Sequence, residues 1–171
     1  MEISGVLITE EKLQNRIKEL SKQIEEDYKG EEILALSVLK GATFFTVDLT
    51  KHIKNPVSFE FIELSSYGSG TESTGKIILN KDITGKIENK NILIIEDIID
   101  TGITMQYLME HIKEKNPNSI QVASLLSKPS RRKVEVPIKY CGFEIPNKFV
   151  VGYGMDYDEK YRNLPYIGYI E

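Results

Sequence analysis

The feature that most constrains this chain is a short apolar run that ends abruptly in acidic residues. Residues 92–95 are all isoleucine or leucine, and Glu96 and Asp97 follow them directly. Asp100 and a Thr-Gly-Ile-Thr turn at residues 101–104 come next, before a segment whose apolar residues recur at helical spacing. A buried strand that runs into a polar turn and then a helix is a common place to bind a phosphate, because the first helical turn has free amides. The additional acids indicate that the ligand carries more than a phosphate.

Apolar runs and helix-spaced patterns alternate along the rest of the chain. Helices are expected at residues 10–28, 44–53 and 105–112, and strands at residues 33–39, 57–64, 76–79, 91–95, 119–126, 140–145 and 148–151. Residues 156–171 are expected to be irregular. Because helices alternate with buried strands, the sequence predicts an α/β fold: one domain over residues 1–171, with a mostly parallel central sheet flanked by helices.

Composition narrows the class of protein. The chain has 171 residues and a formal net charge of −4, which argues against sequence-independent nucleic-acid binding. Cys141 is the only cysteine, so no intrachain disulfide can form, and this fits a reducing compartment. No secretory signal pattern opens the sequence, and no apolar run approaches the roughly 18 residues that span a bilayer. We therefore expect a cytoplasmic protein without nucleic-acid or membrane partners.

The polar residues after the central apolar run suggest two adjoining ligand sites. Thr101 and Thr104 offer hydroxyls, and Gly102 lets the main chain approach a ligand closely, so the turn suits a monophosphate. The alternative is an ordinary helix start capped by Asp100 or Thr101. The Glu96–Asp97 pair suits the vicinal hydroxyls of a sugar, or a magnesium ion held through water. A phosphate and a diol together indicate a ribose 5-phosphate.

Ligands of parallel sheets bind outside the carboxyl ends of the strands. Three further positions near such ends carry polar residues: Lys40-Gly41, Lys128, and Asp156. Taken singly, each has a simpler interpretation, because Lys128 could be a surface lysine, Phe149 a core residue, and Asp156 with Arg162 a plain ion pair. Residues 65–75, rich in glycine, serine and threonine, could be a surface connection or a functional lid, since they exceed the usual hairpin loop of about 2–5 residues.

Residues 94–104, IIEDIIDTGIT, resemble the signature of the type I phosphoribosyltransferases, and more narrowly of the hypoxanthine-guanine phosphoribosyltransferase family. The likeness extends to residues 39–41, 65–68, 142–153 and 156–162, and to Lys128. It implies the type I phosphoribosyltransferase fold, with a small hood formed by the N- and C-terminal segments. It also implies a Mg²⁺-dependent reaction in which 5-phosphoribosyl 1-pyrophosphate and hypoxanthine or guanine give IMP or GMP and pyrophosphate.

The resemblance implies a role for each matching residue. Asp100 would handle the proton at purine N7, while Glu96 and Asp97 would hold the ribose hydroxyls. The implied phosphate-binding residues are Asp100, Thr101, Gly102, Ile103 and Thr104, and the implied pyrophosphate-binding residues are Lys40, Gly41 and Arg162, with a cis peptide in the Lys40 loop. The implied purine-binding residues are Lys128, Phe149, Val150 and Asp156, the implied lid residues are Ser66 and Tyr67, and the implied metal ligands are Glu96, Asp97 and Asp156.

Ile103 departs from the pattern, since several relatives carry a lysine or another polar residue there, so only its amide can contact the phosphate. The family also implies a homo-oligomer, either a dimer or a tetramer. Two rival functions stay open on the sequence alone. One is a regulatory RNA-binding member of the superfamily, and the other is a phosphoribosyltransferase for a different base.

Overall fold

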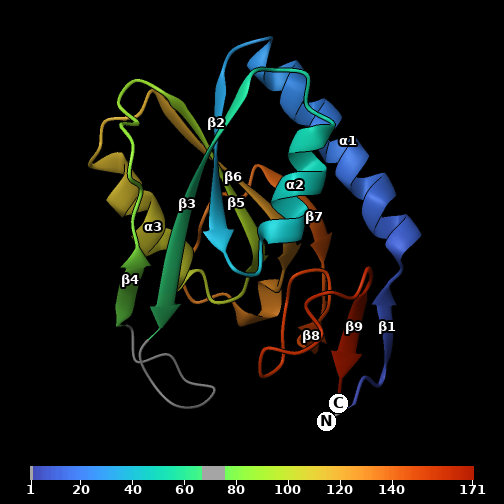
Figure 1. Cartoon of the computed structure of the whole chain (residues 1–171). Helices are drawn as coiled ribbons and strands as arrows, with labels where there is room; N and C mark the ends of the chain where they lie inside the picture. The colour runs from blue at the N-terminus through green and yellow to red at the C-terminus, as the bar shows by residue number, and fades with distance from the viewer. Residues whose placement is uncertain (1, 67–75) are drawn as a thin grey trace.

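The computed structural model describes residues 2–66 and 76–171, and a six-stranded sheet forms its centre (Figure 1). The strands are β2 (Ile33–Leu39), β3 (Val57–Ser66), β4 (Ile77–Lys81), β5 (Asn91–Ile99), β6 (Ser119–Ser127) and β7 (Tyr140–Glu144). They lie in the order β4-β3-β2-β5-β6-β7, and every neighbouring pair is parallel except the β3–β4 pair. The predicted α/β fold with a mostly parallel sheet is therefore confirmed.

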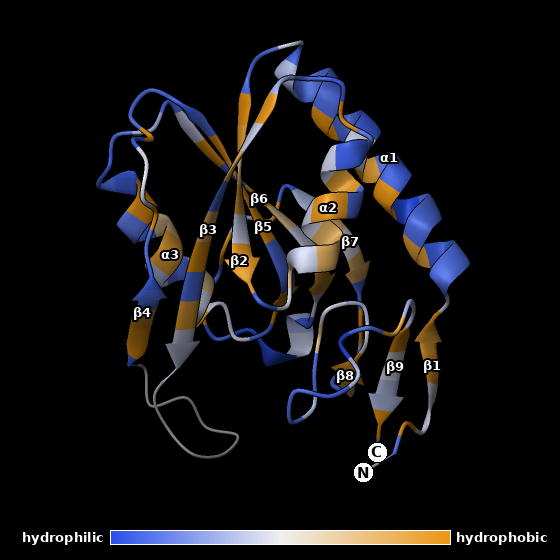
Figure 2. Ribbon diagram, viewed as in Figure 1, coloured by the Kyte–Doolittle hydropathy of each residue, from blue (hydrophilic) through white to orange (hydrophobic). Residues whose placement is uncertain are grey.

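Helices cover both faces of this sheet. Helices α1 (Glu10–Tyr28) and α2 (Thr43–Lys51) pack on one face, and α3 (Ile103–Lys113) packs on the other (Figure 1). The ends of α1 agree with the sequence prediction, because the Thr9 side chain accepts a hydrogen bond from the Lys12 amide and Lys29 is left-handed with φ 44°. Its apolar side chains are buried against the sheet, while its outer face is hydrophilic (Figure 2).

The two central strands are buried from both sides and fix the edge at which the site forms. Along β2, Leu34 and Leu36 pack toward α3, whereas Ala35 packs toward α1 and α2. Along β5, Ile94 packs toward α3 and Ile95 toward α1 and α2. This alternation explains why both segments read as continuous apolar runs. The carboxyl end of β5 is consequently held between two cores.

Strand β5 is longer than the predicted 91–95. Its pairing with β6 continues past the apolar run, joining Glu96 with Ser124, Ile98 with Leu126, and Ile99 with Ser127. Glu96 and Asp97 therefore lie within the strand. The prediction that they follow its end is wrong. Strand β3 likewise extends to Ser66, so Ser65 and Ser66 belong to a strand, while the rest of the predicted loop, including Tyr67, lies outside the described residues.

A second, three-stranded antiparallel sheet joins the two ends of the chain (Figure 1). It contains β1 (Gly5–Ile8), β8 (Phe149–Val151) and β9 (Ile167–Ile170), in the order β1-β9-β8. This sheet is the expected hood of N- and C-terminal segments. Residues 156–171 were predicted to be irregular, which is wrong for β9, and the predicted strand at 148–151 belongs to the hood and not to the central sheet.

No helix in residues 2–66 and 76–171 is both long and apolar enough to cross a membrane.

Candidate active site

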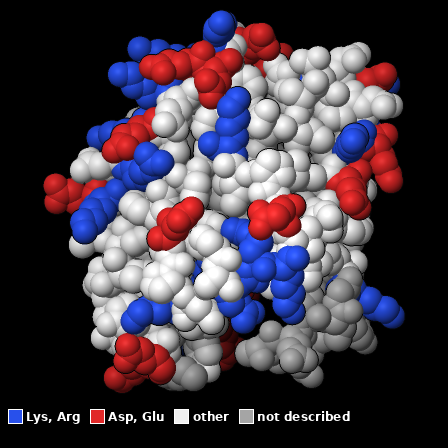
Figure 3. Space-filling model, turned by 180° about the vertical axis from the view of Figure 1, so that it is seen from behind, with Lys and Arg blue, Asp and Glu red and all other residues white. Residues whose placement is uncertain are grey.

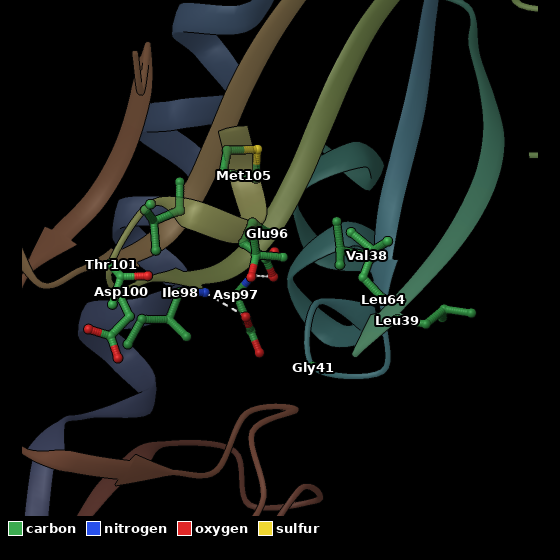
Figure 4. Close-up of a pocket in the computed structure, with 13 residues that line it drawn as sticks. Val38, Leu39, Gly41, Leu64, Glu96, Asp97, Ile98, Asp100, Thr101 and Met105 are labelled. Atoms are coloured by element: carbon green, nitrogen blue, oxygen red, sulfur yellow. Dashed lines mark hydrogen bonds between the residues drawn. The ribbon is translucent and has the colours of Figure 1, made fainter. Parts of the chain in front are cut away.

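Two adjoining cavities open at the carboxyl edge of the central sheet. The first has a volume of about 220 Å³ and lies between the end of β5, the start of α3 and the β2–α2 loop (Figure 4). The second, of about 380 Å³, lies between β5 and the hood. Gly41, Asp97, Ile98 and Asp100 line both. A single ligand can therefore extend from one cavity into the other.

Most of the residues singled out in the sequence line these cavities. The first is lined by Gly41, Glu96, Asp97, Asp100, Thr101, Gly102 and Thr104, among others, and the second by Lys40, Gly41, Asp97, Asp100, Lys128, Phe149, Val150, Asp156 and Arg162, among others. Ile103 begins α3 and Ser66 ends β3, and neither lines either cavity. Tyr67 lies outside the described residues.

The turn before α3 leaves main-chain amides open toward the first cavity. Gly102 is the N-cap, with φ 89°, and has no side chain to cap the helix. The Thr101 hydroxyl lies 3.4 Å from the Ile103 amide, a contact at the upper limit for a hydrogen bond. A Cβ atom at Gly102 would overlap the Val134 carbonyl oxygen. Because no side chain makes a strong capping hydrogen bond, the main-chain amides in the first turn of α3 can donate to an anion.

The acidic pair projects from β5 into the same region (Figure 4). Glu96 is only 9% exposed, and its carboxyl accepts a hydrogen bond from the Asp97 amide at 2.9 Å. Burial, together with the neighbouring Asp97 carboxylate, raises the pKa of Glu96 well above its usual value. Asp97 accepts from the Ile98 amide at 2.6 Å and lines both cavities. The pair can form hydrogen bonds with two neighbouring hydroxyl groups.

The β2–α2 loop is wedged between Asp97 and the hood. A Cβ atom at Gly41 would overlap Asp97 Oδ2, and one at Gly154, which has φ 99°, would overlap the Gly41 carbonyl oxygen. The peptide bond between Leu39 and Lys40 is cis, as the resemblance implies. The Lys40 carbonyl accepts from the Thr43 hydroxyl at 2.6 Å, and the Lys40 ammonium lies 3.5 Å from Glu159. Only glycine fits at positions 41 and 154 without displacing a neighbour.

Lys128, Phe149 and Val150 line the second cavity but not the first. Lys128, just after β6, is 8% exposed, and burial lowers its pKa, an effect that the nearby Asp100 carboxylate opposes. Phe149, on β8, is 50% exposed and packs edge-on against Tyr157 with ring centroids 5.7 Å apart. Val150 is buried beside it. A half-exposed ring and a lysine ammonium group in one cavity suit a flat ligand with a hydrogen-bond acceptor.

Asp156 and Arg162 form the ion pair that the sequence left as an alternative, with a separation of 3.3 Å. The Arg162 guanidinium also donates to the Gly154 carbonyl at 2.7 Å and to Glu159 at 3.1 Å. Arg162 Nε is buried and has no hydrogen-bond partner within the described part of the chain. Both side chains also line the second cavity, so they can contact a ligand as well as stabilise residues 154–162.

No group of three or more His, Cys, Asp or Glu side chains among the described residues forms a metal cage. Glu96, Asp97 and Asp156 therefore do not make a common ligand set by themselves. Magnesium usually binds one or two carboxylates together with substrate phosphates and water, and it does not require such a cage. Asp97 and Asp156, hard oxygen donors that both line the second cavity, fit that mode.

Arg131, the first of three consecutive basic residues, also contacts the site. Its Nε atom donates to Asp100 Oδ1 at 3.0 Å. Residues Pro129–Arg131 form a 3-10 turn that begins directly after Lys128 and folds Arg131 back toward Asp100. The proline after Lys128 was the one local signal for this turn.

Comparison with known proteins identifies the family. The model of the phosphoribosyl transferase domain matches residues 8–158. A hypoxanthine-guanine phosphoribosyltransferase of Staphylococcus aureus strain Mu50 is 48% identical over 167 residues, which cover 98% of this chain and 93% of that protein.

Solved structures agree. The crystal structure of a hypoxanthine-guanine phosphoribosyltransferase from Bacillus anthracis has a TM-score of 0.95 and 50% identity, covering 99% of this chain and all of that one. A hypoxanthine phosphoribosyltransferase from Staphylococcus aureus gives 0.94 and 47%, covering 99% and 92% of the respective chains. This chain therefore belongs to the phosphoribosyltransferase family, in its hypoxanthine-guanine branch.

Proposed function

We propose that the two cavities form the active site of a 6-oxopurine salvage enzyme, with the ribose 5-phosphate in the first cavity and the purine in the second. The enzyme transfers the 5-phosphoribosyl group of 5-phosphoribosyl 1-pyrophosphate to hypoxanthine or guanine, giving IMP or GMP and pyrophosphate. The observation that supports this assignment most strongly is that Asp97 and Asp100 line both cavities. A sugar bound between them would have its 5-phosphate at the α3 turn and its C1 atom facing the hood.

The first cavity would hold the ribose 5-phosphate. The amides and hydroxyls of residues 101–104 bind the phosphate, in which Ile103 contributes its amide alone. Glu96 and Asp97 bind the ribose hydroxyls. Strand β5 supports this assignment, because the acidic pair lies within the strand and the turn lies beyond its end. The sugar is thus gripped at its hydroxyls and its phosphate, leaving C1 free to react.

The purine would occupy the second cavity, stacked on the Phe149 ring. Lys128 donates a hydrogen bond to the 6-oxo group, and the Val150 carbonyl faces the purine 2-position. As purine N9 attacks C1 and the bond to pyrophosphate breaks, Asp100 accepts the proton that leaves N7. Asp156 lines the same cavity, where it would lie beside the base. An adenine amino group would meet the Lys128 ammonium as a donor facing a donor, which opposes binding.

The leaving pyrophosphate would bind between the Lys40–Gly41 loop and Arg162. Arg162 Nε is a buried donor with no hydrogen-bond partner among residues 2–66 and 76–171, and the loop presents the ammonium group of Lys40. Mg²⁺, when bound with the substrate by Asp97 and Asp156, with Glu96 as a further carboxylate near the sugar, would neutralise the charge that develops on pyrophosphate. Ser66 and Tyr67 would cover the leaving group and exclude water, which competes with the base for C1.

Lys128→Met tests the assignment of the base site. Removing the ammonium group should raise KM for hypoxanthine and guanine by roughly 10- to 100-fold, the usual worth of a hydrogen bond to a charged group. Discrimination against adenine should fall at the same time, while KM for 5-phosphoribosyl 1-pyrophosphate stays within about two-fold. Steady-state kinetics with each base measure this. Unchanged base kinetics would remove Lys128 from purine recognition.

We also propose that two copies of the chain associate through an apolar patch made of Phe44, Val47, Phe59 and Phe61, all of which are exposed. Phe59 and Phe61 pair with Ala35 and Ser37 of β2, and Ser37 bonds Thr46 of α2 at 2.7 Å, so the patch lies on the α2 face of the sheet. Exposed patches of large apolar side chains commonly mark protein interfaces.

Sedimentation velocity tests this association. The wild type should sediment as a dimer or a tetramer, and the double variant Val47→Glu/Phe59→Glu should sediment as a smaller species, because two charges would be buried at the contact. Val6→Glu is the matched control, since Val6 is equally exposed on β1 but lies outside the patch. A wild-type monomer, or no change in the double variant, would contradict the proposal.

The RNA-binding rival is less well supported. The net charge is −4, and Lys and Arg side chains lie among Asp and Glu side chains over the face seen in Figure 3. An RNA titration at several salt concentrations would reveal such binding as a steep loss of affinity with salt. The cytoplasmic location expected from the sequence stays a prediction.

A further inference from the structure

Asp100, the residue assigned to the purine N7 proton, is held by a side chain that does not line either cavity. Arg131 Nε donates to Asp100 Oδ1 at 3.0 Å, whereas Oδ2 has no hydrogen-bond partner among the described residues. The contact therefore uses one carboxylate oxygen and leaves the other free. Because Asp100 lines both cavities, its free oxygen is available to a ligand in either.

The main chain holds Arg131 in this position. The Arg131 amide donates to the Lys128 carbonyl at 3.0 Å, closing the 3-10 turn, and the Lys128 amide donates to the Ile99 carbonyl at 3.0 Å. Beyond the turn, the Lys133 and Val134 amides both donate to the Thr101 carbonyl, at 2.9 and 3.0 Å. The segment after β6 is thus hydrogen-bonded to the residues on both sides of Asp100, which holds the Arg131 main chain within reach of the Asp100 carboxylate.

Two cations share the Asp100 carboxylate at the proposed base site. The nearly buried Lys128 ammonium and the Arg131 guanidinium both lie near the single carboxylate of Asp100. When Lys128 donates to a purine oxo group, the hydrogen bond from Arg131 to Asp100 Oδ1 would keep the Asp100 carboxylate from moving toward Lys128. A guanidinium can do this because its donors are fixed in a plane.

Resting on the proposed function, we infer that Arg131 is a positioning residue for the reaction: it fixes the Asp100 carboxylate so that Oδ2 faces purine N7. It acts through Asp100 and makes no contact with the substrate. Its contribution should therefore appear in kcat, and it should disappear when residue 100 can no longer accept the proton.

A double-mutant cycle tests this coupling. The variants are Arg131→Gln, Asp100→Asn and the pair, with Arg131→Lys as the conservative change and Lys113→Gln as a matched loss of one exposed charge at the end of α3. Conversion of isotope-labelled hypoxanthine gives a rate even for slow variants, and thermal unfolding reports whether each variant is folded.

Arg131→Gln should lower kcat roughly ten-fold, within the range found for residues in one hydrogen-bonded network, with KM for 5-phosphoribosyl 1-pyrophosphate within two-fold of wild type. Arg131→Lys should lose less, and Lys113→Gln should match wild type. In the Asp100→Asn background, Arg131→Gln should have no further effect. An Arg131→Gln rate within two-fold of wild type, or an equal loss in both backgrounds, would overturn the inference.

Turnover by the wild type distinguishes a failure of the proposed function from a failure of the role inferred for Arg131. If the wild type turns over neither hypoxanthine nor guanine, the proposed function itself is wrong. If it turns over either base but the cycle shows no coupling, only the role of Arg131 is wrong.

Discussion

Asp100→Asn is expected to lower kcat by about 10²- to 10⁴-fold, the usual contribution of a positioned acid or base. Asn has nearly the same shape as Asp, and its oxygen can still accept from Arg131, but a neutral amide cannot take the purine proton. The change therefore removes proton transfer and leaves the turn in place. The measurement is the single-turnover rate of IMP formation, which isolates chemistry from product release.

Two controls make this result specific. The variant should unfold within a few degrees of wild type, because Asp100 lies at the surface of the site and its side chain is 41% exposed. It should also bind IMP nearly as well as wild type does, since the phosphate turn is intact. A single-turnover rate within two-fold of wild type would remove Asp100 from proton transfer.

The second large effect is expected from Gly41→Ala. An added methyl group would overlap Asp97 Oδ2 and lie 2.8 Å from Asp97 Cγ, so either the loop or the carboxylate must move. The Gly41 carbonyl is itself in close contact with Gly154, which leaves the loop little room to retreat. Displacement of reacting groups by about 1 Å can cost roughly 100-fold in rate. We expect a loss of this order in kcat/KM for 5-phosphoribosyl 1-pyrophosphate, with the fold retained.

Gly30→Ala is the matched control for this substitution. Gly30 lies just after α1 with φ 80°, and nothing lies within 4 Å of an added Cβ atom. This variant should lose about 1–2 kcal/mol of stability from its left-handed backbone while keeping full activity. If Gly41→Ala were as active as Gly30→Ala, the contact between Gly41 and Asp97 would not matter for substrate binding.

The parts of the fold that the sequence predicts well are those with long, one-sided or wholly apolar patterns. Helix α1 begins and ends as expected because Thr9 and the Lys29-Gly30 pair supply local capping signals. Strand β2 matches its predicted bounds because it is apolar throughout and buried on both faces. The apolar start of β5 was recognised for the same reason, but its end was not, since the pairing beyond Ile95 depends on β6.

The hood was not predictable from local pattern. Strands β1 and β9 contain four residues each, too few to show a period, and they become strands only by pairing across almost the whole length of the chain. The hood moves Phe149 away from the central sheet and beside the second cavity. The family resemblance predicted that Phe149 belongs to the base site. The alternation of helices and strands predicted that it belongs to the central sheet, which is wrong.

The candidate site was mostly predictable because strand ends of a parallel sheet converge on one edge. Lys40, Asp97, Asp100 and Lys128 come from three different strand ends and still meet there. The contact of Arg131 with Asp100 escaped prediction, since nothing in a run of basic residues says which one folds back. Ser66 and Tyr67 remain predictions for the lid.

The most direct test of this account is a turnover assay with hypoxanthine, guanine, xanthine and adenine, each with 5-phosphoribosyl 1-pyrophosphate and Mg²⁺. The account predicts rapid formation of IMP or GMP from the first two bases and at least about 100-fold lower kcat/KM for adenine, because Lys128 would face its amino group. No turnover of either hypoxanthine or guanine, or a preference for adenine, would contradict it.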